Sequence, residues 1–412
     1  MAQTFQEALQ ATEDLPLIAY SFLEETDADF AVKLATQEMN QIEFRSRHAS
    51  MARRLNGRFK DLLEVYVESS GSAFWGTRVD FLHRTMRDFL RSRAVRSMLG
   101  RYLEEESFNA NTSLCRSYLA LIKTMPVQDV KEGYILLIIK EQLDNIMRHA
   151  YQAEIEQRSS DRELLDALEP TLAESPSRGH WPRCHISELV RKKLNVSSNP
   201  CDSLEIASFF DLAVASGLSH YVSERLSETP SLISEGQMPI LGYALQFWVI
   251  LKCRESDLLA MFRLLLERGL DPNKDFHGKV TWLAWLLFIS KGNLSAESNE
   301  GRLRILDLLL RYGGDLQRED VVSEPNSLWE HFVEFFHFNC RDPETASEAD
   351  FFYVFDIFLF HKADPHGVIL SPLSATDGQY PNKASITLSD IFNGKFPRAL
   401  ASRLLRRLQA VS

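Results

Sequence analysis

Residues 265–273 read LLERGLDPN, and the turn that ends this apolar segment recurs twice downstream. The later copies read LLRYGGDLQ at residues 309–317 and FLFHKADPH at residues 358–366. Gly269 and Gly313 suit the left-handed backbone that closes a helix, and in two copies Pro follows the Asp and stops it. Because such a unit buries its apolar face only against its neighbours, the copies predict a stacked helical array.

Weaker motifs open these units, namely MPILGYA at residues 238–244 and TWLA at residues 281–284. The segment 211–226 has small and apolar residues at helix–turn–helix spacing. Together with the turns, these motifs resemble the T-P-L-H-x-A opening and the G-A-D-x-N ending of ankyrin repeats. The resemblance covers residues 205–412 and implies a degenerate ankyrin-like array. Paired-helix repeats of the HEAT or TPR type are the structural alternative.

The spacing of the copies departs from the ankyrin pattern. The turn aspartates Asp271, Asp315 and Asp364 lie 44 and 49 residues apart, against about 33 residues in a standard ankyrin unit. The extra residues fall in polar, loop-like segments between the copies. The third turn has Lys362 where Gly is expected. The aromatic residues between 332 and 358 fall at helical spacing and are expected mostly in the core.

A second distinctive string, VDFLHRTMRDFL, stands at residues 79–90. It resembles the V-x-F-L-H-R-T-V-x-D-F-L segment that follows the NTPase domain in fungal NACHT-type (STAND) signalling ATPases. Upstream, RRLNGRFKDLLEV at residues 53–65 resembles the R-L-N-S-R-C-K-G-L-L-E-V of the same family. The resemblance covers about residues 15–155. It implies a helical, winged-helix-like module between the ATPase and a C-terminal sensor, which is often a repeat array.

Local patterns in this N-terminal part predict helices around a short strand. Apolar residues at helical spacing predict helices over 37–67 and 127–157, and residues 79–82 alternate weakly as a strand. Thr85 fits the N-cap of the next helix. Asp88, three residues on, fits the carboxylate of a capping-box pair.

Length and composition bound the architecture. The chain has 412 residues, 45% of them hydrophobic, which suffices for two or three units with sizeable cores. We predict a mostly α fold with a helical, winged-helix-like module at 1–157 and degenerate ankyrin-like repeats at 183–412. Between them lies a polar, breaker-rich linker at 158–182, with a short helix at 162–168.

The cellular location follows from what the sequence lacks. Five scattered cysteines without CxxC spacing argue against disulfides, and the first residues carry no secretory signal pattern. No apolar stretch reaches the about 20 residues that span a bilayer. We therefore expect a cytoplasmic protein, with the nucleus as the alternative.

The motifs that suggest chemistry are weak. His83 with Asp88 suggests acid–base catalysis, but a strand-to-helix junction explains both residues better. Cys184, His185 and Cys201 supply three scattered ligands, whereas a closed zinc site needs four. We expect no catalytic residue, no cofactor, no metal and no small-molecule substrate, and hence no enzyme.

The net charge of −11 opposes binding to nucleic-acid phosphates and to anionic membranes. Residues 45–101 are the exception, because thirteen Lys or Arg stand there against five Asp or Glu and give a local charge of +8. A basic helix with Arg84, Arg87 and Arg91 could contact phosphates. The alternative is a solvated face, or pairing with the chain's own acids, and we expect no nucleic-acid partner and no membrane.

The leading interpretation is a non-catalytic protein–protein interaction scaffold or sensor that contacts protein partners through its repeats. Candidate contacts near the turn tips are Lys274, Phe276, His277 and Trp282. The alternative is a regulatory remnant or fragment of a NACHT-type ATPase. Both Gly-Lys pairs of the chain lack the Ser or Thr of a P-loop, so the NTPase domain is missing from it or lies upstream. The remote alternative is an enzyme of unrecognised type.

Overall fold

The computed structural model divides the chain into two compact units. Unit 1 spans Met1–Ser198 and Glu205–Glu228, and unit 2 spans Asn199–Leu204 and Thr229–Ser412. The residues that the structure describes are 15–59, 62–67, 74–104, 108–126, 132–173, 208–235, 241, 244, 254–276, 279–280, 299–317, 329–330, 332–333, 336, 347–363 and 387–411.

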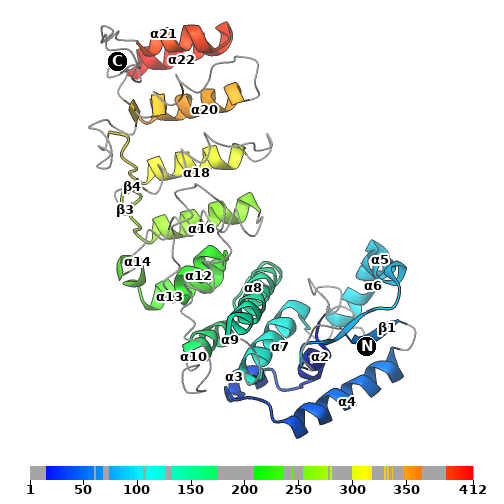
Figure 1. The fold of residues 1–412 in the computed structure, drawn as a ribbon. Helices are drawn as coiled ribbons and strands as arrows, with labels where there is room; N and C mark the ends of the chain where they lie inside the picture. The colour runs from blue at the N-terminus through cyan, green and yellow to red at the C-terminus, as the bar shows by residue number, and fades with distance from the viewer. Residues whose placement is uncertain are drawn as a thin grey trace, which may run out of the picture. The chain divides into compact units, whose positions relative to one another are not determined.

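Helices dominate both units, so the fold is mainly α, as the sequence predicted (Figure 1). The elements of unit 1 are α2 (Leu17–Leu23), α3 (Phe30–Lys33), α4 (Gln41–Arg58), β1 (Leu63–Val67), β2 (Thr77–Phe81), α5 (Arg84–Arg91), α6 (Arg93–Glu104), α7 (Ala110–Thr124), α8 (Glu132–Gln157), α9 (Arg162–Asp166), α10 (Leu168–Ala173), α12 (Phe209–Ala215) and α13 (Ser219–Glu228). The elements of unit 2 are α14 (Leu232–Glu235), α16 (Glu255–Glu267), β3 (Asp275–Phe276), β4 (Lys279–Val280), α18 (Asn299–Arg311), α20 (Ser347–Phe360), α21 (Leu388–Lys395) and α22 (Arg398–Val411). Within the described ranges, no helix is both long enough and apolar enough to cross a lipid bilayer.

Helix α7 forms the centre of unit 1. Its N-cap Asn109 accepts a hydrogen bond from the Thr112 N–H at 2.9 Å, which fixes the start of the helix. All of its side chains are buried except Ser113 and Arg116, because α2, α3, α8, α9 and α10 contact it. Burial on nearly all sides is typical of a helix in the middle of a core.

One cation lies within this core. Lys123 is 5% exposed, and its Nζ donates hydrogen bonds to the carbonyl oxygens of Ala31, Val32 and Leu34 at 2.9, 2.9 and 3.0 Å. These carbonyls stand at the C-terminal end of α3, where a helix leaves its acceptors open and favours a positive charge. Lys123 therefore ties the central helix to α3.

The chain after α4 turns into a β-hairpin. Strands β1 and β2 pair antiparallel, with Val65 opposite Val79. The predicted helix over 37–67 was therefore wrong at its C-terminal end, because α4 stops at Arg58 and residues 63–67 form β1. The stretch LEVYV is rich in β-branched and aromatic residues, and β2 supplies its hydrogen-bond partners. The predicted strand is present as part of β2.

Helix α5 begins one residue before the predicted cap. Thr85 lies inside the helix, and the N-cap is His83, which has extended backbone and forms no side-chain cap. Asp88 does not complete a capping box; it lies 3.8 Å from the guanidinium of Arg84. The prediction of a Thr85–Asp88 cap was wrong, because the helix already begins at Arg84 and places Thr85 in its first turn.

Helices α12 and α13 pack within unit 1. The start of α12 is fixed by a capping box between Ser208 and Asp211. Tyr221 Oη donates a hydrogen bond to Asp166 Oδ1 at 2.7 Å, and Arg162 pairs with Glu228. Because Asp166 and Arg162 lie on α9, these contacts join the 209–228 segment to the helix that the sequence predicted near 162–168.

The long helices of unit 2 lie next to one another in chain order. Helix α16 contacts α18, α18 contacts α20, and α20 contacts α22 (Figure 1). Each of the first two buries a pair of leucines just before its turn, Leu265 with Leu266 and Leu309 with Leu310. Neighbouring helices therefore share their apolar faces.

Aromatic rings fill the centre of unit 2. Phe355 on α20 is fully buried. Its ring centroid lies between 5.0 and 5.9 Å from those of five other rings, which belong to Trp329, Phe332, Phe336, Phe392 and Phe396. The side chains of Phe332, Phe336, Phe352, Phe355 and Phe358 are thus in the core, as predicted. The cluster joins α20 to α21.

Candidate partner-binding surface

The turn that ends α16 has the geometry of a helix C-cap. Gly269 has φ +90°, and its N–H donates to the carbonyl oxygen of Leu266 at 3.0 Å. The next N–H, of Leu270, donates to the carbonyl oxygen of Leu265 at 3.1 Å. This pair of bonds is a Schellman motif, which satisfies the open carbonyls of the last helical turn.

The other two copies close their helices in the same way. At the end of α18, the N–H groups of Gly313 and Gly314 donate to Leu310 and Leu309 at 3.1 and 3.0 Å. At the end of α20, the N–H groups of Lys362 and Ala363 donate to Leu359 and Phe358 at 3.2 and 3.0 Å. The φ angles are +95° at Gly313 and +63° at Lys362. The three repeated stretches of sequence therefore form one repeated turn.

A single side chain links two of these turns. Asn273 Nδ2 donates to the carbonyl oxygen of Gly313 at 2.7 Å, and Asn273 Oδ1 accepts the N–H of Asp315 at 2.7 Å. Asp271 and Asp315 each brace their own turn by accepting the N–H two residues on, both at 2.8 Å. The Asn273 side chain thus forms two hydrogen bonds with the backbone of the turn after α18, while Asn273 itself belongs to the turn after α16. These two bonds hold the two turns in a fixed register.

The four predicted contact residues follow the first turn. Lys274 is half-buried, and its N–H donates to the carbonyl oxygen of Asp271 at 3.3 Å. Phe276 ends β3, where its backbone pairs with Lys279 of β4. His277 and Trp282 lie outside the described residues, as does the side chain of Phe276. The described part of this group is thus a short hairpin directly after the bridged turn.

Two sets of contacts in unit 2, those of Asn273 and Asp307, were not predicted from the sequence. Asn273 ends the stretch 265–273, but its hydrogen bonds to Gly313 and Asp315 depend on which turn packs beside it. Asp307 on α18 accepts Arg311 at 2.7 Å and lies 2.9 Å from His361 Nε2, after α20. The Asp307–Arg311 spacing of four residues was the one available signal, since such pairs meet on a helix surface.

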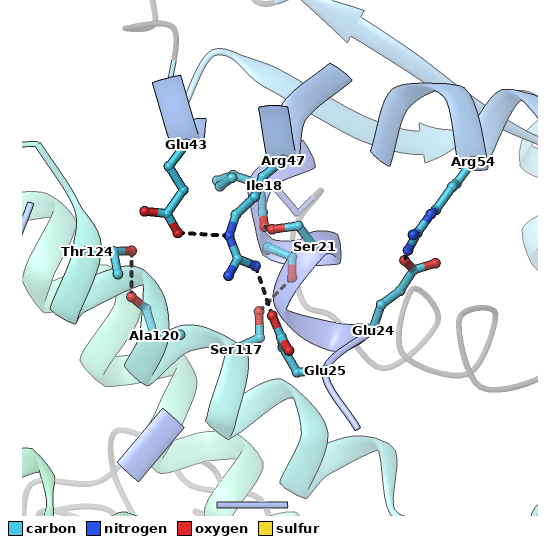
Figure 2. Close-up of polar contacts among 11 residues, drawn as sticks. Ile18, Ser21, Glu24, Glu25, Glu43, Arg47, Arg54, Ser117, Ala120 and Thr124 are labelled. Carbon is cyan, nitrogen blue, oxygen red and sulfur yellow. Dashed lines mark hydrogen bonds and ion pairs between the residues drawn. The ribbon is translucent and has the colours of Figure 1, made fainter. Parts of the chain in front are cut away.

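The basic segment of unit 1 is partly neutralised by its own chain. Figure 2 shows Arg47 and Arg54 of α4 reaching the carboxylates of Glu25 and Glu24 at the end of α2. Arg47 lies 2.9 Å from Glu25, and Arg58 also pairs with Glu24, at 3.2 Å. One face of α4 is thus occupied by acids, which agrees with the alternative to phosphate binding.

A groove of about 720 Å³ lies beside these ion pairs, between the end of α2, α4 and the start of α7. Every charged residue that lines it has an ion-pair partner within the chain. The pairs are Arg54 and Arg58 with Glu24, Arg47 with Glu25, Lys33 with Asp27, and Arg116 with Asp161. The charged side chains that line the groove are therefore already paired within the chain, with Arg54 and Arg58 sharing Glu24.

The buried titratable groups of unit 1 are poor candidates for catalysis. Burial lowers the pKa of His149 to about 4, so the imidazole is neutral; its Nδ1 lies 2.9 Å from Asn111 Oδ1. Burial raises the pKa of the Cys115 thiol, which keeps it from ionising. His149 and Cys115 are each 2% exposed, so neither is open to a substrate. Both residues serve the packing of α7 on α8.

Glu154 on α8 is the most unusual of these groups. Its carboxylate accepts the backbone N–H groups of His220 and Tyr221, both at 3.0 Å, at the start of α13. Burial raises the pKa of Glu154 to about 7, against the effect of these two donors. Glu154 therefore anchors α13 and titrates near neutral pH.

Within the described ranges, no group of three or more His, Cys, Asp or Glu side chains could hold a metal ion. Cys184, His185 and Cys201 lie outside those ranges. His83 is the N-cap residue of α5 without a side-chain cap, and Asp88 lies 3.8 Å from Arg84.

Comparison with known proteins adds one finding about unit 1. Residues 1–131 match the family model of a domain of unknown function (DUF7791). No curated protein and no solved structure matches the chain. The matched segment includes the strings at 53–65 and 79–90.

Proposed function

We propose that this protein is a non-catalytic scaffold or sensor whose unit 2 is a degenerate ankyrin-like array that binds a protein partner. The observation that supports this most directly is the bridge from Asn273 to the turn of the next copy. A bridge of this kind sets successive helices at a constant offset, as in a repeat array. The same Schellman turn at three helix ends supports the same interpretation.

The proposed contact surface is the hairpin that follows the bridged turn. Lys274 and Phe276 stand directly after a turn whose backbone is fixed by Asn273, so they are presented from a rigid base. Lys274 and Phe276 are two residues apart in the sequence, and the aromatic side chain suits a protein partner because aromatic residues dominate the energetics of such interfaces. The proposed location is the cytoplasm or the nucleus.

The test uses the full-length protein as bait in an extract of its native host. The double variant Lys274→Glu, Phe276→Ala should lose proteins that the wild type captures. The matched variant Arg263→Glu changes an exposed charge on α16, away from the turn, and should retain them. Equal capture by the double variant would refute the assignment of binding to the turns.

A truncation that tests the role of unit 2 should end at Glu228, the last residue of unit 1. Removing residues 205–412 would delete α13, which Glu154 and Arg162 hold within unit 1. A chain that ends at Glu228 keeps these contacts and should still lose the partner. Retention of the partner by this shorter chain would move the binding site to unit 1.

The second proposal is that unit 1 is the regulatory module of a NACHT-type signalling ATPase whose NTPase is supplied elsewhere. The quoted string 79–90 forms a defined junction: Arg87 on α5 pairs with Asp80 on β2 and lies 5.4 Å from the ring of Phe81. A hairpin with adjoining helices suits the winged-helix-like module that the resemblance implies. The genomic sequence upstream of Met1 discriminates, because an in-frame P-loop would favour this proposal and its absence would count against it.

A further inference from the structure

Helices α5 and α6 carry large apolar side chains on their exposed surface. Phe89 is 59% exposed and Met98 is 51% exposed, and Leu82, just before α5, is 43% exposed. The two helices contact each other, and among their described residues only Leu90 and Val95 are buried. All three side chains lie on one pair of adjoining helices or directly before it, and exposed apolar surface marks interaction sites.

Arginines lie on the same two helices as these side chains. Arg91 and Arg93 are exposed, and no described carboxylate lies within ion-pair distance of either. Arg84 has a side chain that is 92% exposed and lies 3.8 Å from Asp88. This surface differs from α4, where Glu24 and Glu25 pair with the arginines of one face.

The basic residues of β2, α5 and α6 are all arginines within residues 78–101. Between residues 78 and 101 there are seven arginines, no lysine and two aspartates, which gives a local charge of +5. Arginine binds a carboxylate through two parallel hydrogen bonds, and it is enriched with Phe and Met at protein interfaces, where lysine is depleted. The acidic run that starts at Glu104 marks the end of the basic stretch.

We propose that the α5–α6 surface is a docking site for an acidic, amphipathic segment of a partner protein. Carboxylates of the segment would pair with Arg84, Arg91 and Arg93, and its apolar side chains would cover Phe89 and Met98. Arg, Phe and Met are the residue types enriched at protein interfaces, which favours a protein segment as the partner. The site lies in unit 1 and is independent of the turns proposed for unit 2.

The experiment measures fluorescence anisotropy of labelled probes with the full-length protein. The test probe is a helical peptide of about 15 residues with Glu on one face and Leu and Phe on the other. The control peptide has Gln in place of each Glu. We expect saturable binding of the acidic peptide, weakened by salt, and binding of the Gln peptide at least about tenfold weaker.

Matched variants locate the site. Arg91→Glu with Arg93→Glu should weaken binding of the acidic peptide by about tenfold or more, and Phe89→Ala by about threefold to tenfold. Arg45→Glu with Arg53→Glu makes the same charge change at exposed positions of α4 and should change binding by less than about twofold. Circular dichroism of all variants should match the wild type, because the changed side chains are exposed.

Three outcomes would overturn the proposal. The first is equal binding of the acidic and the Gln peptides. The second is an equal loss in the α4 control variant, which would indicate attraction by charge alone. The third is tight binding of single-stranded DNA or phosphatidylserine vesicles together with no binding of the peptide, which would assign the surface to phosphates.

Discussion

The two units bury different kinds of side chain. In unit 1 the core around α7 and α8 contains charged and polar groups, among them Lys123, Asn111, His149 and Glu154. In the described part of unit 2 the buried side chains are all apolar, and the largest of them are aromatic. The difference indicates that specific polar contacts specify the fold of unit 1. In unit 2, packed volume and the conformation of the repeated turns specify the fold.

This contrast has a thermodynamic consequence. A buried polar group stabilises a fold only while its partners are present and in the right protonation state. An aromatic cluster has no such dependence, and it loses stability mainly when a change leaves a cavity. Changes in unit 1 should therefore act through partners and pH, and changes in unit 2 through volume and backbone.

The largest effect should come from the centre of unit 2. Phe355→Ala removes a fully buried ring that packs against five others, and should lower the free energy of unfolding of unit 2 by about 4 kcal/mol. Hydrogen exchange of peptides from α18, α20 and α22 measures this loss. Peptides from α7 should keep their protection in this variant. The control variant is Tyr353→Ala, whose side chain is 47% exposed, and it should keep wild-type protection throughout the protein. Loss of protection in α7 would show that the two units unfold together.

The next effect should come from the buried cation of unit 1. Lys123→Met keeps the length of the side chain but leaves the carbonyl oxygens of Ala31, Val32 and Leu34 without their charged donor. We expect a loss of about 3 kcal/mol in unit 1, because hydrogen bonds to charged groups contribute more than neutral ones. Exchange of α7 amides is the measurement. Lys33→Met, an exposed change on the adjacent α3, is the control and should leave α7 protection unchanged; equal effects would contradict the role of Lys123.

The pH dependence of unit 1 should be a smaller effect. Burial raises the pKa of Glu154 from 4.5 to about 7, so the folded protein keeps a proton that the unfolded chain has lost. The contribution of this group is full below pH 4.5 and is lost as the pH rises through 7. Stability of unit 1 should therefore fall by about 2 kcal/mol between about pH 5 and pH 7 from this group.

Denaturant unfolding at several pH values measures this slope. Glu154→Gln cannot ionise and should flatten the pH dependence of stability. The amide has one acceptor oxygen for the two N–H groups of α13, so this variant should also be less stable at every pH. Glu163→Gln, an exposed change on α9, should retain the wild-type slope. Glu224 also raises the pKa of Glu154, so Glu224→Gln should shift the transition slightly towards lower pH. An unchanged slope in Glu154→Gln would assign the pH dependence to other groups.

The sequence predicted the features of the fold that depend on neighbouring residues. The left-handed turns at Gly269 and Gly313 and the helix closure before them follow from local residue preferences. The strand β1 was missed because its helical pattern was read without its partner, and only the pairing with β2 satisfies its backbone. The same reason explains Lys123 and Glu154, whose partners lie far away in the chain.

The candidate surfaces divide in the same way. Lys274 and Phe276 could be proposed from their place after a predicted turn. The bridge by Asn273 could not, because it joins residues 42 positions apart. The exposure of Phe89 could not be predicted either, because it depends on which elements pack against α5. Which arginines already have acidic partners follows only from the packing of α2 against α4.

The smallest effect should come from the turns themselves, and it has opposite signs in two copies. Lys362 adopts a φ of +63° that glycine reaches without strain. Lys362→Gly should therefore stabilise unit 2 by about 0.5–1 kcal/mol. This gain is smaller than the strain energy that it relieves, because glycine also increases the conformational entropy of the unfolded chain. Gly313→Ala should destabilise it by about 1 kcal/mol through backbone strain, since an added Cβ would meet nothing within 4 Å. Exchange of α18 and α20 amides measures both changes. If Lys362→Gly lowered protection instead, the lysine side chain would contribute more than the turn conformation, and the third copy would not be equivalent to the first two.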